Sequence, residues 1–207
     1  MVETAQLSRW RGDFGNAYIE RNEVTPENHQ KRQNVWQDIL KKTSSSEVKS
    51  ILEVGSNIGL NIRALKEVSK AELYAVEPNP KARQRILDDN VLDQHHVLDG
   101  SAFVLPFDDA SKDLVFTCGV LIHVHPDDLQ KACNEIYRVS KKYILAIEIF
   151  SKKSEVIHYR GYDDMLFKRD YGLKWMEFYP NLKPIAQGFL WQPTTSIDDS
   201  VWWLIEK

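Results

Sequence analysis

The sequence predicts an α/β protein with a single open, doubly wound and mostly parallel sheet that ends in an antiparallel hairpin. Three observations predict this fold class. Short apolar runs alternate with helical patterns between residues 48 and 149, a glycine directly follows the first apolar run, and two β-like segments close the chain. Strands separated by helices pair in parallel through right-handed crossovers, so the alternation predicts a sheet with helices on both faces.

The length and composition favour one domain. The chain has 207 residues, of which 43% are hydrophobic, and this is enough for one substantial core. Within that domain the sequence predicts four parts. They are an N-terminal arm with a helix (1–46), a core (47–150), an insertion (151–180) and a C-terminal hairpin (181–207).

The N-terminal part combines an aromatic arm with an amphipathic helix. Residues 2–26 mix aromatic side chains with charges, which predicts irregular or short helical structure whose aromatics dock on the rest of the protein. After Pro26, which suits a first helical turn, residues 27–42 show a helical pattern that stops at the serine-rich stretch 43–46. The apolar stripe of this helix is made of Val35, Trp36, Ile39 and Leu40.

The core part alternates strands with helices. Its first strand ends at Gly55, and its second is closed by the proline-containing sequence Glu77-Pro78-Asn79-Pro80. The full pattern predicts strands at 48–54, 73–76, 97–98, 114–117 and 143–149 and helices at 58–69, 81–89 and 126–139.

The alternation breaks after residue 150. The stretch 151–180 is polar and rich in aromatic residues, and we interpret it as an insertion that covers the site, with a helix at about 168–178. Two β-like segments, 185–191 and 200–205, then predict the terminal hairpin, with the pair Asp198-Asp199 near its turn.

Charge and cysteine content narrow the partners. Lys and Arg number 27 against 30 Asp and Glu, a formal net charge of −3 without a basic stripe, so nucleic acid is not favoured as a partner. No run approaches the roughly 18 apolar residues of a membrane span, and the first ten residues are too polar for a signal peptide. We therefore expect no membrane association and a cytoplasmic location. The two cysteines, Cys118 and Cys133, are expected to be reduced.

The loop after the first strand is the first candidate site, because ligands of open α/β sheets bind beyond the carboxyl ends of the strands. A dinucleotide-binding loop would have a glycine where Asn57 stands, and a phosphate-binding loop would have a Lys before Ser or Thr. The sequence instead has Glu-x-Gly-x-x-x-Gly, at Glu53, Gly55 and Gly59. This pattern resembles the loop of class I methyltransferases, which use S-adenosylmethionine.

The resemblance implies a Rossmann-like fold and a cofactor that presents a methionine chain to this loop. Gly55 and Gly59 would allow close backbone approach, and Glu53 would receive the cofactor's ammonium directly or through water. The alternative is an ordinary strand-to-helix turn punctuated by glycine. The other polar residues of the loop, expected to serve the cofactor's carboxylate or the helix start, are Ser56, Asn57 and Asn61.

Further cofactor contacts are predicted at the ends of the next strands. Glu77 follows the second strand and stands roughly 20 residues after Gly55, the spacing at which an acidic side chain accepts both ribose hydroxyls. The alternative is a solvated carboxylate at the end of the strand. Asp99 offers a carboxylate to the adenine amino group, and the segment after the fourth strand would pass beneath the sulfonium. The predicted set is Glu77, Pro78, Asn79, Asp99, Gly100, Ser101, Cys118, Gly119 and Val120.

Two histidines are the candidates for acid–base chemistry. Methyl transfer to a hydroxyl benefits from a base, and His123 and His125 can take a proton near neutral pH. Each could instead orient backbone, and His125, which precedes Pro126, could only mark a helix entry. A metal site would need a third ligand besides the two histidines, so no metal is predicted.

The insertion supplies candidate acceptor contacts. Arg160 could hold a carboxylate or phosphate with its planar guanidinium, and the rings of Tyr159 and Tyr162 could cover the acceptor. The alternative is a surface loop held by salt bridges.

Nearly the whole chain resembles the methylases associated with pseudaminic acid biosynthesis, within the class I methyltransferases. The motifs that carry the resemblance are Trp10-Arg11-Gly12-Asp13-Phe14-Gly15, Tyr18-Ile19-Glu20-Arg21-Asn22, the Glu53 loop, Tyr159-Arg160-Gly161, Leu166-Phe167-Lys168-Arg169-Asp170 and Asp198-Asp199-Ser200-Val201-Trp202. The resemblance implies that Tyr18 and Arg21 fold over the cofactor, with Arg21 near its carboxylate. Asn is frequent in that family where His125 stands, which favours His123 for chemistry.

The sequence therefore predicts a methyltransferase that uses S-adenosylmethionine and a small-molecule acceptor, such as a nonulosonic acid or a nucleotide sugar. It leaves open a methyltransferase that acts on protein or nucleic acid and a non-catalytic cofactor-binding partner subunit. A nicotinamide-dependent sugar oxidoreductase would need the glycine that Asn57 replaces. We expect a monomer or a homodimer.

Overall fold

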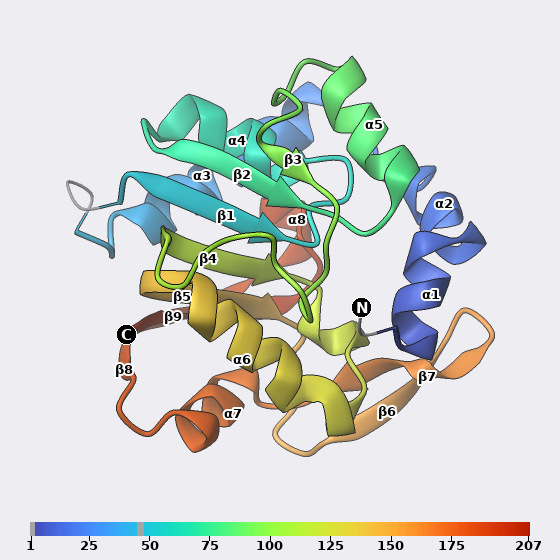
Figure 1. Cartoon of the computed structure of the whole chain (residues 1–207), viewed down its shortest axis with the longest axis vertical. Coiled ribbons are helices and arrows are strands. Elements are labelled where there is room, and N and C mark those ends of the chain that lie inside the picture. Colours follow the sequence, from blue (N-terminus) through green and yellow to red (C-terminus); the bar gives the residue numbers. More distant parts are fainter. Residues whose placement is uncertain (1–2, 45–47) are drawn as a thin grey trace.

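The computed structural model describes residues 3–44 and 48–207, and a seven-stranded sheet runs through it (Figure 1). The strand order is β3-β2-β1-β4-β5-β9-β8; the first five strands of the chain are parallel, and the pairs β5–β9 and β9–β8 are antiparallel. This confirms the predicted sheet and its terminal hairpin. The strands are β1 (Ser50–Val54), β2 (Glu72–Val76), β3 (Val97–Leu98), β4 (Lys112–Cys118), β5 (Ser140–Glu148), β8 (Lys183–Leu190) and β9 (Ser200–Glu206).

Successive residues of a strand point to opposite faces of the sheet, and in the parallel strands both sets are largely apolar. Helices therefore cover both faces. On one face, Trp36 and Leu65 belong to the same hydrophobic cluster as Ile51 of β1. On the other face, Ile136 and Trp175 belong to the cluster that contains Leu52 of β1. The helices of the first face are α3 (Pro26–Leu40), α4 (Leu60–Val68) and α5 (Pro80–Asp88), and those of the second are α6 (Leu129–Val139) and α7 (Tyr171–Phe178).

The insertion differs from its prediction, because most of it forms a two-stranded antiparallel hairpin. The strands β6 (Glu155–Tyr159) and β7 (Tyr162–Lys168) are joined by Arg160 and Gly161, which both have positive φ (52° and 88°), as a tight hairpin turn requires. The helix α7 begins only after Asp170, whose side chain caps it by accepting from the Leu173 N–H. Residues 168–170, predicted to be helical, belong to the end of β7 and to this cap.

The N-terminal arm forms two short helices, α1 (Ala5–Arg11) and α2 (Asp13–Ile19), beside the hairpin at the carboxyl ends of the parallel strands (Figure 1). Arg9 pairs with Asp164 of β7 at 2.6 Å and lies over the Tyr162 ring at 4.4 Å. The arm and the insertion, far apart in the sequence, therefore form one roof, which we define as α1, α2 and the β6–β7 hairpin.

The remaining elements are short. The segment after β4 contains 3-10 turns at Leu121–His123 and Pro126–Asp128, and α8 (Gln192–Thr195) precedes β9. Within residues 3–44 and 48–207, no helix is long and apolar enough to span a membrane. Part of the serine-rich stop predicted at 43–46 lies outside the described residues.

Candidate active site

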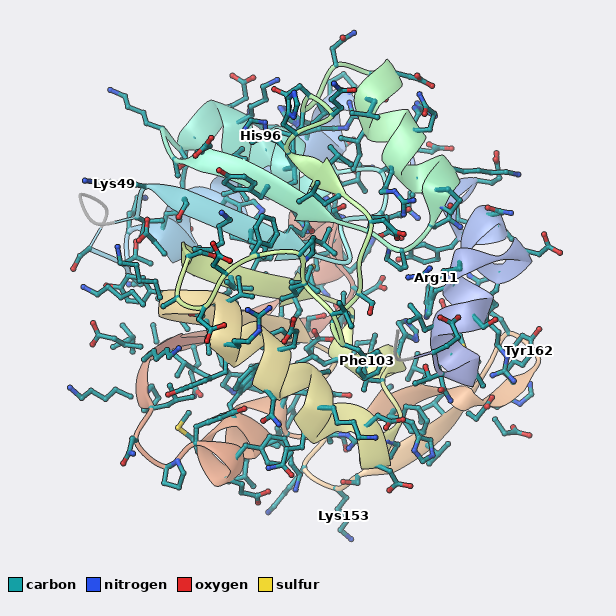
Figure 2. The ribbon with its side chains drawn as sticks, viewed as in Figure 1. Arg11, Lys49, His96, Phe103, Lys153 and Tyr162 are labelled. Atoms are coloured by element: carbon teal, nitrogen blue, oxygen red, sulfur yellow. The ribbon has the colours of Figure 1, made fainter. Side chains whose placement is uncertain are left out.

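A cavity of about 260 Å³ opens at the carboxyl ends of β1, β2 and β4, beneath α1 and α2. Arg11 on α1 and Phe103 in the segment after β3 mark two sides of this region in Figure 2, and Phe103 also lines the cavity. Fourteen of the predicted site residues line the cavity, so residues spread along the sequence converge there. They are Tyr18, Glu53, Gly55, Ser56, Asn57, Asn61, Glu77, Pro78, Asn79, Ser101, Cys118, Gly119, Val120 and His123.

The loop after β1 is shaped by three residues with positive φ, namely Gly55 (77°), Asn57 (47°) and Gly59 (76°). A Cβ atom at Gly55 would lie 2.5 Å from Cγ2 of Val120, so the loop after β1 touches the loop after β4 and only glycine fits. Gly59 starts α4 and packs against Ile86 instead of lining the cavity. Gly55 thus allows the two loops to touch, whereas Gly59 begins the helix α4.

A buried carboxyl group lies at the floor of the cavity. Glu53 is 2% exposed, and its Oε1 accepts a hydrogen bond from Nδ2 of Asn61 at 2.7 Å. Its Oε2 has no partner, which is costly for a buried carboxylate. Burial raises the pKa of Glu53 to about 8. The site thus has an unused acceptor that suits a cationic amine.

Arg32 completes this polar group from α3. Its two terminal nitrogens donate to Oδ1 of Asn61 at 2.8 Å and to the carbonyl oxygen of Ser196 at 2.6 Å. Asn61 therefore receives from Arg32 while it donates to Glu53, which fixes the orientation of its amide. Sequence reasoning missed Arg32, since its position in a helical pattern carries no site signal.

Glu77 lies at the end of β2, 7% exposed, with both carboxylate oxygens turned to backbone N–H groups. The Asn57 N–H donates at 2.7 Å and the Asn79 N–H at 2.8 Å. Burial raises the pKa of Glu77 to about 7. Because each carboxylate oxygen accepts more than one hydrogen bond, the group can also receive a pair of ligand hydroxyls.

Asn79 connects this carboxylate to the roof. Its side chain caps α5 by accepting from the Lys81 and Ala82 N–H groups, and its Nδ2 donates to the carbonyl oxygen of Trp10 and to Oδ1 of Asn16, both at 3.1 Å. The N-terminal helices are thus held directly on the end of β2.

Of the three adenine contacts predicted after β3, one lines the cavity and two do not. Ser101 lines the cavity, whereas Asp99 and Gly100 do not. The Asp99 carboxylate is half-exposed and accepts from Arg83 at 2.9 Å, with Arg11 at 3.8 Å. Asp99 is therefore engaged in ion pairs at the rim of the cavity.

The segment after β4 is held by a buried carboxyl group that sequence reasoning missed. Glu148, at the end of β5, is fully buried and accepts from the Thr117 hydroxyl at 2.8 Å and from three backbone N–H groups at 3.1–3.3 Å, those of Val120, Leu121 and Ile122. Burial raises its pKa to about 7. Glu148 thereby positions both the cavity-lining residues 118–120 and the following His123. Burial also raises the pKa of the Cys118 thiol to about 12, so this thiol stays protonated.

His123 lines the cavity in a defined tautomer. Its Nδ1 lies 2.5 Å from the carbonyl oxygen of Met165, which only accepts, so Nδ1 carries the proton and Nε2 the lone pair. Burial lowers the pKa of His123 to about 4, and the imidazole is neutral at pH 7. The rings of Trp10 and Tyr159 lie 4.8 and 5.5 Å from its ring.

His125 lies outside the cavity. It caps the second 3-10 turn, where its Nδ1 accepts from the Asp127 N–H at 3.3 Å, and its ring packs edge-on against Phe167 at 5.5 Å. This geometry matches the alternative of a helix entry.

The four other predicted residues lie at the rim and do not line the cavity. Arg21 lies over the Tyr18 ring at 5.0 Å, and Arg160 over the Tyr159 ring at 5.5 Å. Tyr162 packs edge-on against Phe14 of α2. Tyr159 is the nearest of them to the cavity through its contact with His123. Burial, and next the charge of Asp198, raise the pKa of Tyr18 to about 12.

Sequence reasoning missed much of the lining from the chain ends. Tyr18 is the only described residue of the arm that the sequence predicts to be in the site and that lines the cavity. The lining residues that the sequence does not single out include Gln6, Leu7, Trp10, Ile197 and Asp198. Among the described residues, no group of three or more His, Cys, Asp or Glu side chains is arranged to hold a metal ion.

Residues 52–143 match a methyltransferase domain family. The match starts within β1 and ends within β5, so it contains the glycine loop, Glu77 and His123. No curated protein sequence matches the chain.

Solved methyltransferase structures share the fold. A Leishmania major SAM-dependent methyltransferase is similar at 14% identity with a TM-score of 0.71, over 98% of this chain and 87% of that chain. Burkholderia thailandensis 1,6-didemethyltoxoflavin-N1-methyltransferase, with bound 1,6-didemethyltoxoflavin and S-adenosylhomocysteine, is 14% identical with a TM-score of 0.72, over 100% and 92% of the chains. Magnesium protoporphyrin IX methyltransferase from Synechocystis, with bound S-adenosylhomocysteine, is 12% identical with a TM-score of 0.68, over 97% of both chains.

Proposed function

We propose that this protein is an S-adenosylmethionine-dependent methyltransferase that acts on a small molecule. One observation carries the proposal: the unpartnered carboxylate oxygen of Glu53 and the Glu77 carboxylate lie in one cavity, within the stretch that matches a methyltransferase domain. The first suits an ammonium group and the second a ribose diol.

S-adenosylmethionine is the cofactor, and its sulfonium supplies an electrophilic methyl group. Glu53 and Arg32 would hold the ammonium and carboxylate of the methionine end, since both line the cavity and are joined through Asn61. Glu77 would hold the ribose, and Ser101 would lie at the adenine end. Asp99 could reach the cofactor only if its ion pair with Arg83 opened, and Arg21 only if it left the Tyr18 ring.

Methyl transfer is an in-line displacement, so the main tasks of the chain are to align the acceptor and to exclude water. Trp10 and Tyr18 of the roof cover the cavity and serve the second task. For a hydroxyl acceptor, Nε2 of His123 would take the proton, while the bond from Nδ1 to Met165 holds the ring. His125, which caps a turn, is not part of this step.

The resemblance to the pseudaminic acid-associated methylases suggests a nonulosonic acid or a nucleotide sugar as acceptor. Tyr159, Arg160 and Tyr162 would then meet the acceptor at the mouth of the cavity. The Burkholderia relative in fold, whose solved structure holds a small heterocyclic acceptor, supports the small-molecule class. A cytoplasmic location and a monomeric or homodimeric state remain predictions.

The test has two stages. In calorimetry with S-adenosylhomocysteine, Glu77→Ala should weaken binding at least tenfold, whereas Glu67→Ala, at an exposed position of α4, should not change it. Unchanged affinity in Glu77→Ala would refute the site. Methyl incorporation from S-adenosylmethionine into small molecules, followed by mass spectrometry, then tests turnover; incorporation into protein or nucleic acid alone, or binding without any turnover, would favour the other two functions.

A further inference from the structure

Five apolar side chains from three segments line the cavity together with His123. Leu7 and Trp10 come from α1, Ile122 and Val124 flank His123 after β4, and Ile149 follows β5. We call these five residues with His123 the acceptor chamber. Leu7, Ile122 and Val124 are each no more than 6% exposed, so a molecule in the chamber loses most of its contact with water.

Four described residues that line the cavity are charged; none of them belongs to the chamber, and three of the four are acidic. Among the described residues they are Arg32, Glu53, Glu77 and Asp198. The guanidinium of Arg32, the one cationic group among them, already donates to Asn61 and Ser196. A carboxylate or phosphate in the chamber would thus lie among apolar side chains without a cationic partner, an arrangement that disfavours it.

His123 adds a second argument of its own. Because Nδ1–H is used on Met165, the ring presents the lone pair of Nε2, which attracts an O–H or N–H group and repels an anionic oxygen. The lowered pKa of the imidazole keeps this polarity at neutral pH.

The cationic side chains of the roof are directed elsewhere. Arg9 is engaged by Asp164 at 2.6 Å and by the Tyr162 ring, and Arg160 lies in the hairpin turn over Tyr159. They lie at the mouth, where they could meet only a part of the acceptor that remains outside the chamber.

We infer that the reactive part of the acceptor is uncharged and largely apolar, with one hydroxyl or amino group that carries its own hydrogen to Nε2 of His123. This inference rests on the proposed function and narrows its substrate class. It therefore argues against a nonulosonic acid, one of the acceptors that the family resemblance suggests, when the carboxylate is close to the methylated atom.

Two probes of the same shape test the inference, namely 4-hydroxy-2-naphthamide and 4-hydroxy-2-naphthoate, which differ in charge and carry the amide or carboxylate on the same ring as the hydroxyl group. Binding of each to the protein saturated with S-adenosylhomocysteine is measured by equilibrium dialysis at pH 7. The amide should bind at least tenfold more tightly. Equal or tighter binding of the naphthoate, or no binding of the amide, would overturn the inference.

A charge-introducing variant sharpens the test. Leu7→Arg places a guanidinium in the chamber and should reverse the preference between the two probes, whereas Leu7→Met, a neutral control of similar size, should keep it. Circular dichroism checks that both variants fold, and a folded Leu7→Arg that still prefers the amide tenfold counts against the chamber as the binding place. Failure of the unmodified protein to bind S-adenosylhomocysteine would refute the proposed function, whereas binding with a preference for the naphthoate refutes only this inference.

Discussion

The floor and the roof of the cavity are built in different ways. The floor consists of strand ends and the loops that follow them; Glu77, for instance, accepts from the N–H groups of Asn57 and Asn79, in loops that follow adjacent strands. The roof consists of segments about 150 residues apart, joined by contacts such as Gln6 to the carbonyl oxygen of Asp164 at 2.9 Å. Under the proposed function, the floor would hold the cofactor and the roof would contact the acceptor.

The largest expected effect separates the two histidines at the junction of floor and roof. His123→Asn should lower kcat about 100- to 10,000-fold with a hydroxyl acceptor, because it removes the lone pair that takes the proton. His125→Asn should change kcat less than twofold, because His125 caps a turn. Steady-state kinetics measures kcat of both variants, and calorimetry checks that both bind S-adenosylhomocysteine with the same affinity. Equal losses of kcat in the two variants would contradict the assignment of the base to His123.

The next effect tests the floor alone. Gly55→Ala combines a positive φ with a Cβ atom 2.5 Å from Val120, a strain of about 3 kcal/mol, so S-adenosylhomocysteine should bind about 100-fold more weakly. Gly12→Ala, whose Cβ atom would lie 3.4 Å from its nearest neighbour and whose φ is −101°, is the control. Calorimetry on both, with melting curves to compare folding, makes the measurement. Wild-type affinity in Gly55→Ala would mean that the two loops do not need this contact.

A pH series probes the floor without changing its shape. The pKa of Glu53 is about 8, so below that pH the free protein holds a proton that an incoming ammonium must displace. Affinity for S-adenosylhomocysteine should therefore rise with pH up to about 8, by at most about tenfold per pH unit. In Glu53→Gln this rise should be reduced, and calorimetry at pH 6, 7 and 8 makes the comparison.

The free protein should show the opposite trend. A carboxyl whose pKa is raised on folding stabilises the fold below its unfolded pKa, about 4.5, and this contribution is lost as the pH rises through the folded value. The free energy of unfolding, measured by chemical denaturation, should therefore fall as the pH rises from 5 to 8 because Glu53 loses its proton. A stability that is constant with pH, together with a constant affinity, would contradict the raised pKa.

The smallest expected effect concerns the roof. Arg9→Ala removes an ion pair whose partners are 28% and 45% exposed, so the loss should be about 1 kcal/mol or less, a melting shift of about 2–4 °C at most. The affinity for S-adenosylhomocysteine should change little. Lys41→Ala, which breaks the exposed pair with Asp38 far from the roof, is the control. A large loss of cofactor affinity in Arg9→Ala would show that roof and floor are not separable.

The same division explains what could be predicted from the sequence. The sheet, the terminal hairpin and the positions of Gly55 and Glu77 follow from local patterns, since apolar runs, glycine and strand-end acids stand at characteristic spacings. Only the family resemblance favours His123 over His125 at the level of sequence, because the geometric difference between them depends on a carbonyl oxygen of Met165, 42 residues away.

The parts that could not be predicted depend on tertiary contacts or on a turn signal that was missed. Arg32 is an unremarkable polar residue of a helix until α4 brings Asn61 beside it. The β6–β7 hairpin was interpreted as an irregular insertion because its strands alternate only weakly, although Arg160-Gly161 is a two-residue turn. The buried Glu148 directly follows the apolar run 143–147 of β5, and its backbone partners come from the loop after β4.

Asn79 gives this architecture a kinetic consequence. Its N–H donates to the Glu77 carboxylate while its side chain donates to the Trp10 carbonyl oxygen, so the proposed ribose site and the first helix share one residue. A nucleoside settling on Glu77 would steady Trp10, which is itself a wall of the chamber beside His123. We expect an ordered sequence of arrival, in which the acceptor finds a completed binding place only after the nucleoside is seated.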